Sequence, residues 1–275
     1  MNILQSIVLG IIQGITEFFP ISSSGHLVII PYFSGWDYPP LYFTVTVHFA
    51  TLLAVLTVLY RDAWRIIRGF IMGLFSRKWR SGSDFKMGLY IIIATIPAVF
   101  AGLFLDGLIE SIFSKPLIVA VFLLVTAFIL WGGEYRGRKV AQKPSLTYIA
   151  ALASGIGQAL AIFPGISRSG LTISFARFFG VKREEAVRFS FLLSIPIILG
   201  SFVFELSRST GIILDGGVHI IWTLFAGLVS AYLSGLFAVK YLLYLTRKKN
   251  LNIFALYCVC LSIAIFVFYI IKNII

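Results

Sequence analysis

The chain has 275 residues, of which 59% are hydrophobic and 12% are charged, and its mean hydropathy is +0.96. Soluble globular domains are usually about 45–50% apolar and about 25% charged, so this composition excludes a disordered protein and an ordinary cytosolic enzyme. The net charge of +12 does not indicate nucleic-acid binding, because the basic residues stand in short clusters between apolar runs, as they do in membrane loops.

The first apolar segment, residues 3–33, is interrupted by Pro20 and by a polar run at 22–26. We expect two half-helices joined by a polar hinge, a re-entrant hairpin, since irregular backbone at membrane depth is tolerated only where protein or a wet cavity covers it. No Lys or Arg precedes Arg61. The segment therefore lacks the positive region of a signal peptide and is expected to stay in the mature protein.

Six continuous apolar runs are long enough, at about 20 residues, to cross the hydrocarbon core. They cover residues 41–60, 87–105, 116–133, 187–206, 218–240 and 251–271. Between the third and the fourth, residues 146–180 are interrupted at 164–170 and predict a second re-entrant hairpin. The runs lack the alternation of barrel strands, so the predicted fold is an all-α, polytopic membrane protein.

The basic clusters predict the orientation of the chain in the membrane. Most of the 23 Lys and Arg residues lie at 61–86, 136–143, 182–183 and 240–249, which we expect on the cytoplasmic side. The loops expected outside carry Asp37, Asp106, Glu110, Glu205 and Asp215. The first hairpin then enters from outside and the second from the cytoplasm. A single membrane domain built as an inverted repeat, of about 1–140 and 146–275, is predicted.

A sequence repeat with an offset of 145 residues supports this division. Gly10, Gln13, Ser22, Ser24 and Gly25 reappear as Gly155, Gln158, Ser167, Ser169 and Gly170. Inverted repeats with broken helices place a site near the midplane of the membrane, so we expect a site where the two hinges meet.

Glu17 is the one acidic residue deep inside an apolar run. A charged group at the centre of a membrane helix costs at least about 2.5 kcal/mol, so it needs a reason. It is either a protonated side chain bonded within the bundle, or a metal ligand or proton-transfer group. Gln13 lies one turn earlier on the same face. The pair could hold one hard cation through oxygen, but two ligands alone do not define a metal site.

The first hinge continues with three serines, Gly25 and His26 at the start of a half-helix. One serine is expected to cap the helix. Free N–H groups at a helix start can cradle phosphate, and a hydroxyl beside an imidazole is a minimal set for covalent or acid–base catalysis. His48 and Arg188 each start a span beside a hinge and could line the same cavity, although span-end polarity explains both as well.

The second hinge places Arg168 at membrane depth, where a permanent charge needs a partner. A salt bridge to Glu17 is one interpretation. The other is bidentate phosphate binding by the guanidinium, with Ser167, Ser169 and Thr172 as neighbouring donors.

Both hinges resemble motifs of the undecaprenyl-diphosphatases, the bacitracin-resistance family. The first is QGITEFFPISSSGH (13–26) and the second is PGISRSGLT (164–172), and the resemblance extends to FSFLLSIP (189–196) and to the chain length. It implies a membrane hydrolase that converts undecaprenyl diphosphate to the monophosphate and inorganic phosphate, recycling the lipid carrier of peptidoglycan synthesis.

The resemblance also implies roles for individual residues. Glu17, Ser23, His26 and Arg168 map to catalytic positions, and Glu17 with Gln13 to the ligands of Mg²⁺ or Ca²⁺. The family allows Glu or Gln at the first of these ligand positions, and Gln13 is the neutral, weaker ligand. The remaining hinge residues are expected around the phosphates: Ser22, Ser24, Gly25, Ser167, Ser169 and Thr172. Ser23, His26 and an activated water stay open as the nucleophile.

The rival hypothesis is a polyprenyl-phosphate flippase or transporter, since inverted repeats with broken helices are also transporter architecture. A carrier needs Arg168 but no nucleophile. We expect a plasma-membrane protein among lipids, with a polyprenyl diphosphate substrate, no nucleic acid, and a site opening to the external side. Homodimerisation and the prenyl chain length stay open.

Overall fold

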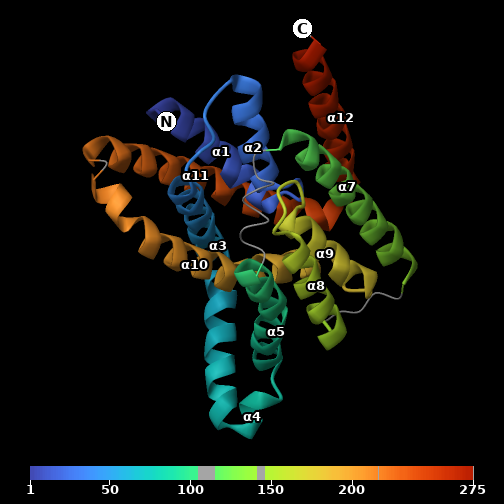
Figure 1. Ribbon diagram of the computed structural model, residues 1–275. Helices are drawn as coiled ribbons and strands as arrows, with labels where there is room; N and C mark the ends of the chain where they lie inside the picture. The colour runs from blue at the N-terminus through green and yellow to red at the C-terminus, as the bar shows by residue number, and fades with distance from the viewer. Residues whose placement is uncertain (105–114, 141–145, 216, 275) are drawn as a thin grey trace.

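The computed structural model describes residues 1–104, 115–140, 146–215 and 217–274, and throughout these ranges the regular elements are helices (Figure 1). They are α1 (Ile3–Phe18), α2 (Ser23–Ser34), α3 (Leu41–Phe75), α4 (Arg77–Arg80), α5 (Ser83–Phe104), α7 (Pro116–Lys139), α8 (Tyr148–Leu160), α9 (Arg168–Phe178), α10 (Arg183–Asp215), α11 (Gly217–Lys248) and α12 (Asn252–Ile274). The predicted all-α fold is confirmed. Asp106, Glu110 and Lys143, used above to orient the chain, lie outside the described residues.

Six helices, α3, α5, α7, α10, α11 and α12, are long and apolar enough to cross a membrane, which confirms the six predicted spans. The chain is therefore a multi-pass membrane protein. Several of these helices run beyond the apolar core into the basic clusters. The largest difference is α3, which continues to Phe75 past a kink at Leu59, where φ is −107° and ψ is 22°.

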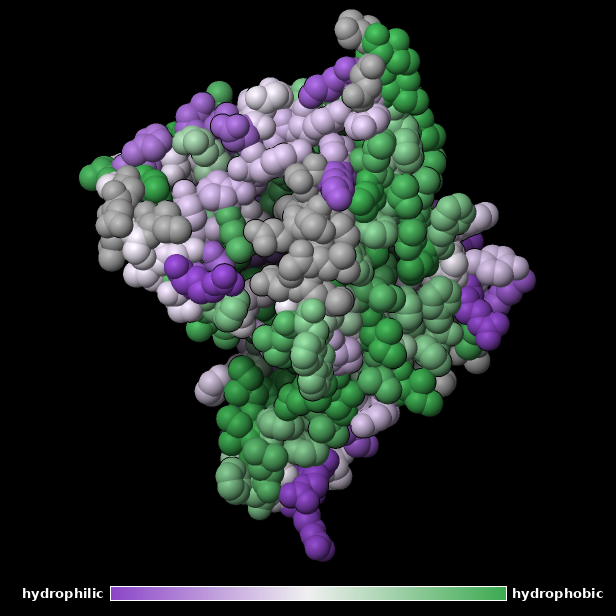
Figure 2. Space-filling model, viewed as in Figure 1, coloured by the Kyte–Doolittle hydropathy of each residue, from purple (hydrophilic) through white to green (hydrophobic). Residues whose placement is uncertain are grey.

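The region expected as a basic loop, 61–86, is mostly helical. The end of α3, α4 and the start of α5 project together from the rest of the molecule (Figure 1). Figure 2 shows hydrophilic residues gathered at the tip of this projection and apolar ones along its sides and along α12. The helices continue here because neither Gly nor Pro interrupts residues 60–68 and the charged side chains reach water from one face.

The two short hairpins, α1–α2 and α8–α9, are built alike at their hinges. Ser22 caps α2 by accepting from the Gly25 N–H at 3.2 Å, and Ser167 caps α9 by accepting from the Gly170 N–H at 3.0 Å. The pair Ser167–Gly170 follows the pair Ser22–Gly25 by 145 residues, so the sequence repeat is also a repeat of the capping geometry. The expected serine cap is thereby confirmed, although Ser22 takes a positive φ of 69° that side chains rarely adopt.

The first helix of each hairpin packs on a helix of the other half of the chain. α1 packs on α11, and its counterpart α8 packs on α5. Gly10 and Gly155 make both approaches close. A Cβ on Gly10 would lie 2.6 Å from the Gly227 carbonyl oxygen, and one on Gly155 would lie 2.7 Å from the Ala94 carbonyl oxygen. Both positions therefore need glycine. The division into repeats at 1–140 and 146–275, and the opposite entry of the hairpins into the membrane, stay predictions.

The hinges themselves meet at the centre of the bundle. The Gly165 N–H donates to Ser22 Oγ at 3.1 Å, and a Cβ on Gly25 would lie 3.2 Å from the Gly165 Cα. Thr126 on α7 joins them, because its hydroxyl donates to the Gly165 carbonyl and accepts from the Ser167 N–H. These bonds satisfy backbone groups that have no helical partner where the two hairpins break.

A second buried charge cluster ties the other ends of α7, α9 and α10 together. Both oxygens of Glu134 accept from Arg183, at 2.6 and 2.7 Å, and the Arg177 guanidinium lies 3.8 Å away. Glu134 and Arg177 are each 2% exposed. A bidentate pair of this kind fixes the relative position of the helices that carry it.

Candidate active site

A pocket of about 290 Å³ opens beside the point where the two hinges meet. Its polar lining comes from α1, α2, α3, α8, the second hinge, α9 and α10: Thr16, Glu17, Ser23, Ser24, His48, Gln158, Ser167, Arg168 and Ser201. Its apolar lining includes Ala98 and Gly102 of α5 and Ile197 and Ile198 of α10. The volume is at the lower end of the range for small-molecule sites, which suits a compact polar group.

Glu17 is the centre of the hydrogen bonds in this pocket. Its Oε2 accepts from the Ser23 hydroxyl at 2.6 Å and from Gln13 Nε2 at 2.8 Å. Its Oε1 accepts from Arg168 at 2.5 Å. Glu17 is 6% exposed, so its negative charge is balanced within the protein rather than by water.

Arg168 combines the two interpretations given above. One guanidinium nitrogen pairs with Glu17 and the other donates to the Ser190 carbonyl at 3.1 Å, while the side chain also lines the pocket. The salt bridge to Glu17 therefore exists and leaves the guanidinium accessible to an anion in the pocket.

The two candidate histidines lie in different places. The Nδ1–H of His26 donates to the Ser22 carbonyl at 2.7 Å, and its Nε2 lies 2.8 Å from the Tyr257 hydroxyl on α12. Its ring stacks on Tyr257, it is 4% exposed, and it is not among the residues that line the pocket. His26 thus holds α2 against α12.

His48 is the histidine in the pocket. Its Nδ1–H donates to the Thr44 carbonyl one turn earlier at 2.7 Å, which fixes the ring, and its Nε2 lies 3.4 Å from Glu17 Oε2. The side chain is 24% exposed. Arg188, proposed together with His48, instead pairs with Asp62 on α3.

The serines and small residues of the hinges divide into two groups. Ser23, Ser24 and Ser167 line the pocket, whereas the other four, Ser22, Gly25, Ser169 and Thr172, bind the hinges to each other or to α10. The Thr172 hydroxyl, for example, lies 2.6 Å from that of Ser190. Of the residues expected around the phosphates, the pocket therefore exposes Ser24 and Ser167.

The residues expected to bind a metal ion do not form a cation site in this arrangement. Gln13 Oε1 is buried without a hydrogen-bond partner, as a vacant ligand would be, but Gln13 directs its Nε2–H toward Glu17. The Glu17 carboxylate is paired with a guanidinium. Across the described residues no group of three His, Cys, Asp or Glu side chains could hold an ion. One carboxylate and one amide fall short of the protein oxygens of a Ca²⁺ site, and an Mg²⁺ ion on Glu17 would have to share the carboxylate with Arg168.

Three residues of the site, Gln158, Ser190 and Tyr257, were not predicted from the sequence as functional. Gln158 lines the pocket and is the repeat counterpart of Gln13, so the 145-residue offset could have indicated it. Tyr257 and Ser190 contact His26 and Arg168 through side-chain and backbone oxygens. Tyr257 lies in an apolar segment that carries no signal for its contact, whereas Ser190 lies in the 189–196 stretch that is part of the family resemblance.

The chain is similar in sequence to a known protein family over nearly its whole length. A family model described as "Bacitracin resistance protein BacA" matches residues 6–264. A Korarchaeum cryptofilum protein named undecaprenyl-diphosphatase is 42% identical, with 96% of this chain and 98% of the relative covered. Proteins of the same name from Thermodesulfovibrio yellowstonii and Desulforudis audaxviator are 40% and 35% identical. They cover 99% of this chain, and 99% and 100% of their own lengths, respectively.

Proposed function

The chain belongs to the bacitracin resistance protein BacA family, and from this membership we propose that it is an undecaprenyl-diphosphatase. It hydrolyses undecaprenyl diphosphate, or a polyprenyl diphosphate of another length, to the monophosphate and inorganic phosphate. The prenyl monophosphate returns to cell-wall synthesis as lipid carrier. The corresponding cellular role is bacitracin resistance, which depends on the removal of this diphosphate.

The observation that supports hydrolysis most directly is the hydrogen bond from Ser23 Oγ to Glu17 Oε2 at 2.6 Å inside the pocket. A hydroxyl beside a carboxylate base is the arrangement that activates a nucleophile. A carrier has no use for it. Arg168 supplies the positive charge that the diphosphate and its transition state require.

The proposed reaction has two steps. Ser23 Oγ attacks the terminal phosphorus in line, its proton passes to Glu17, and the bond from that phosphorus to the bridging oxygen breaks. Polyprenyl monophosphate leaves with that oxygen. Glu17 passes the proton gained from Ser23 to the oxygen of the leaving monophosphate and is again a carboxylate. Water then attacks the phosphoserine and gives a proton to Glu17, the bond from phosphorus to Ser23 Oγ breaks, and Glu17 returns that proton to Ser23 Oγ as inorganic phosphate is released.

His48 and His26 have different roles in this proposal. His48 faces the Glu17 carboxylate and is the imidazole placed to exchange protons with it. His26 is a positioning residue, since both of its ring nitrogens are engaged outside the pocket and its bond to the Ser22 carbonyl holds the first turn of α2. An attack by His26 or by water is the alternative that the Ser23 variant tests.

No step above passes through a metal ion, because the donor set around Glu17 does not form a cation site. Where the reaction requires Mg²⁺ or Ca²⁺, the ion is proposed to enter bound to the diphosphate, whose oxygens supply most of its ligands. The protein is proposed to lie in the plasma membrane with the basic ends of its spans in the cytoplasm and the pocket open to the outside.

The test is phosphate release from undecaprenyl diphosphate by the purified protein with Mg²⁺, with Ca²⁺ and with EDTA, alongside Ser23→Ala. Release by the wild type that is lost in the variant supports Ser23 as nucleophile. Release that persists in the variant moves the attack to water or to His26. Folded wild-type protein that releases no phosphate under any of these conditions contradicts the enzyme and favours a flippase.

A further inference from the structure

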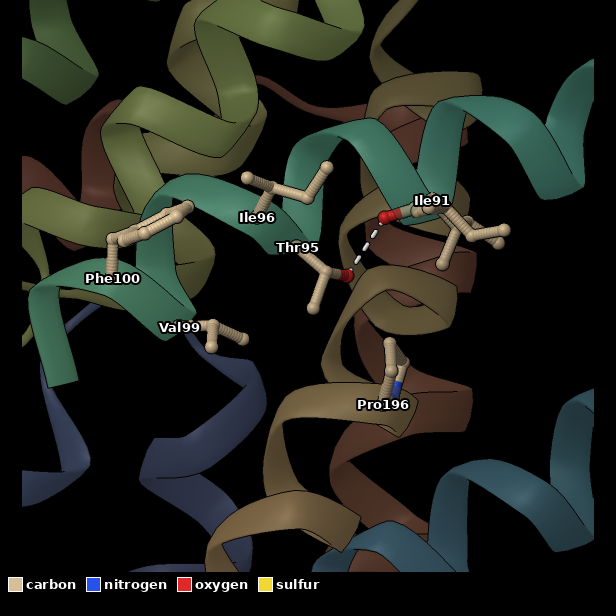
Figure 3. A pocket seen from close by; sticks show the side chains of 7 residues that line it. Ile91, Thr95, Ile96, Val99, Phe100 and Pro196 are labelled. Carbon is tan, nitrogen blue, oxygen red and sulfur yellow. Dashed lines mark hydrogen bonds between the residues drawn. The ribbon is translucent and has the colours of Figure 1, made fainter. Parts of the chain in front are cut away.

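A second hollow lies between α5 and α10, and its lining is apolar (Figure 3). The lining residues are Ile91, Ile92, Thr95, Ile96, Val99 and Phe100 of α5 and Pro196 of α10. The one hydroxyl among them, that of Thr95, donates to the Ile91 carbonyl within α5 at 2.7 Å. We call this hollow the α5–α10 groove. It offers no free hydrogen-bonding side chain to a ligand.

The lining of the groove adjoins the lining of the pocket that holds Glu17 along α5. Ile91, Thr95, Ala98 and Gly102 follow one another by four, three and four residues, the spacing that keeps side chains on one helix face. The first two line the groove and the last two line the pocket. On α10 the same change occurs directly after Pro196, because Ile197 and Ile198 line the pocket.

Small residues border the junction of the two hollows. Ala98 and Gly102 lie on α5 and Ser201 lies on α10. A Cβ on Gly102 would meet no described atom within 4 Å, so among the described residues no close helix contact requires glycine here. A larger side chain at Gly102 would stand in the part of the lining that α5 contributes to the pocket.

From the adjacency of the two linings on α5 and α10 we propose that the α5–α10 groove binds the first isoprene units of the substrate's hydrocarbon tail. This inference rests on the proposed function, which places the diphosphate beside Ser23 and Arg168. A pocket of about 290 Å³ is too small to take in a polyprenyl chain together with the diphosphate, so the tail leaves it. The groove of about 260 Å³ is the apolar hollow whose lining adjoins that of the pocket on α5 and α10.

The depth of the groove along α5 fits a lipid. The helix has 22 residues and, at about 1.5 Å per residue, spans about 33 Å. Gly102 stands near its C-terminal end, whereas Ile91 and Ile92 stand near its middle. A diphosphate in the pocket therefore lies near the C-terminal end of α5, while its tail runs along α5 toward the middle of that helix.

The groove orients the substrate rather than adding much affinity. Lipid tails are as apolar as the groove, so moving a prenyl chain from bilayer to groove gains little hydrophobic free energy. Its effect is to hold the first units of the tail in one direction, which aligns the terminal phosphorus with Ser23. Alignment of this kind acts on kcat/KM, and a misplacement of about 1 Å can cost about 100-fold in rate.

The test compares Gly102→Leu with the matched control Gly200→Leu on undecaprenyl diphosphate and on dimethylallyl diphosphate, whose five-carbon tail is too short to follow the groove. Gly200 is also a helical glycine whose Cβ would meet no described atom, but it lines neither hollow. We expect Gly102→Leu to lower kcat/KM on the long substrate about tenfold or more beyond its effect on the short one, because only the long tail is misaligned. Gly200→Leu should change neither.

A Gly102→Leu variant that keeps full activity on the long substrate, or loses both activities equally, overturns the groove. Wild-type protein that hydrolyses neither diphosphate overturns the proposed function instead. A farnesyl diphosphate carrying a diazirine on its third isoprene unit gives a measurement independent of turnover. Labelling of peptides containing 91–100 or Pro196, reduced in Gly102→Leu, supports the groove, and labelling confined to other helices contradicts it.

Discussion

The substitution Glu17→Gln separates the chemical role of this carboxylate from its structural one. It keeps the size of the side chain but removes the base that accepts the Ser23 proton and the charge that balances Arg168. Loss of a positioned base costs about 10²–10⁴ in rate. We expect phosphate release to fall about 10³-fold, since the amide cannot take the proton.

The structural cost follows from the burial of the pair. Removing one partner of a buried ion pair destabilises a protein by about 3–5 kcal/mol. Arg168 keeps its bond to the Ser190 carbonyl and its side chain is 15% exposed, so we expect a loss near the lower limit, about 3 kcal/mol. The double variant Glu17→Gln/Arg168→Met removes both charges and should regain most of the stability without regaining activity.

The assays are phosphate release from undecaprenyl diphosphate and the thermal midpoint of the same preparations in detergent. Glu17→Gln with more than about a tenth of wild-type turnover would refute the role of Glu17 as base. A double variant less stable than either single variant would refute the assignment of the lost stability to an unpaired charge. The two results are independent, because one concerns the reaction and the other the folded state.

Four further outcomes are expected. His48→Phe should lower turnover about 10²-fold with little loss of stability. His26→Phe should lower the thermal midpoint, and His26→Asn should lower it less, because Asn keeps a donor for the Ser22 carbonyl. Equal turnover in His48→Phe and His26→Phe would contradict the different roles proposed for the two histidines. Gln13→Glu adds a second carboxylate beside Glu17 and should leave the Mg²⁺ concentration for half-maximal release unchanged, because the ion is proposed to come with the diphosphate; a lowered value would show that these two positions contact the ion. Glu134→Gln leaves Arg177 and Arg183 unpaired and should destabilise the protein by about 3 kcal/mol, with Glu184→Gln, at an exposed ion pair, as the near-neutral control. In intact cells Asp37→Cys should react with an impermeant thiol reagent, in a background without Cys258 and Cys260, and reaction only after lysis would reverse the predicted orientation.

The sequence determined the features that depend on local order along the chain. Hydropathy fixed six spans, because a run of about 20 apolar residues crosses a membrane whatever its neighbours are. The breaks at residues 19–22 and 161–167 follow from Pro, Gly and polar residues, which cannot continue a helix, and the hinge serines cap the next one. The pairing of Gln13 with Glu17 is likewise local, since four residues make one helical turn.

The tertiary structure decided which of these residues meet. His26 lies in the first turn of α2, whereas His48, expected at the start of its span, lies about two turns into α3. The family resemblance pointed to His26, and the chain order alone does not show which histidine enters the pocket. His26 contacts Tyr257, 231 residues away in the chain, and lies outside the pocket. His48 lines the pocket from α3. The pairing of Glu17 with Arg168 and the α5–α10 groove also depend on how separate helices pack. The residues of a uniformly apolar span look alike in sequence, and only helix rotation and crossing determine which of them face a neighbour, the lipid or a cavity.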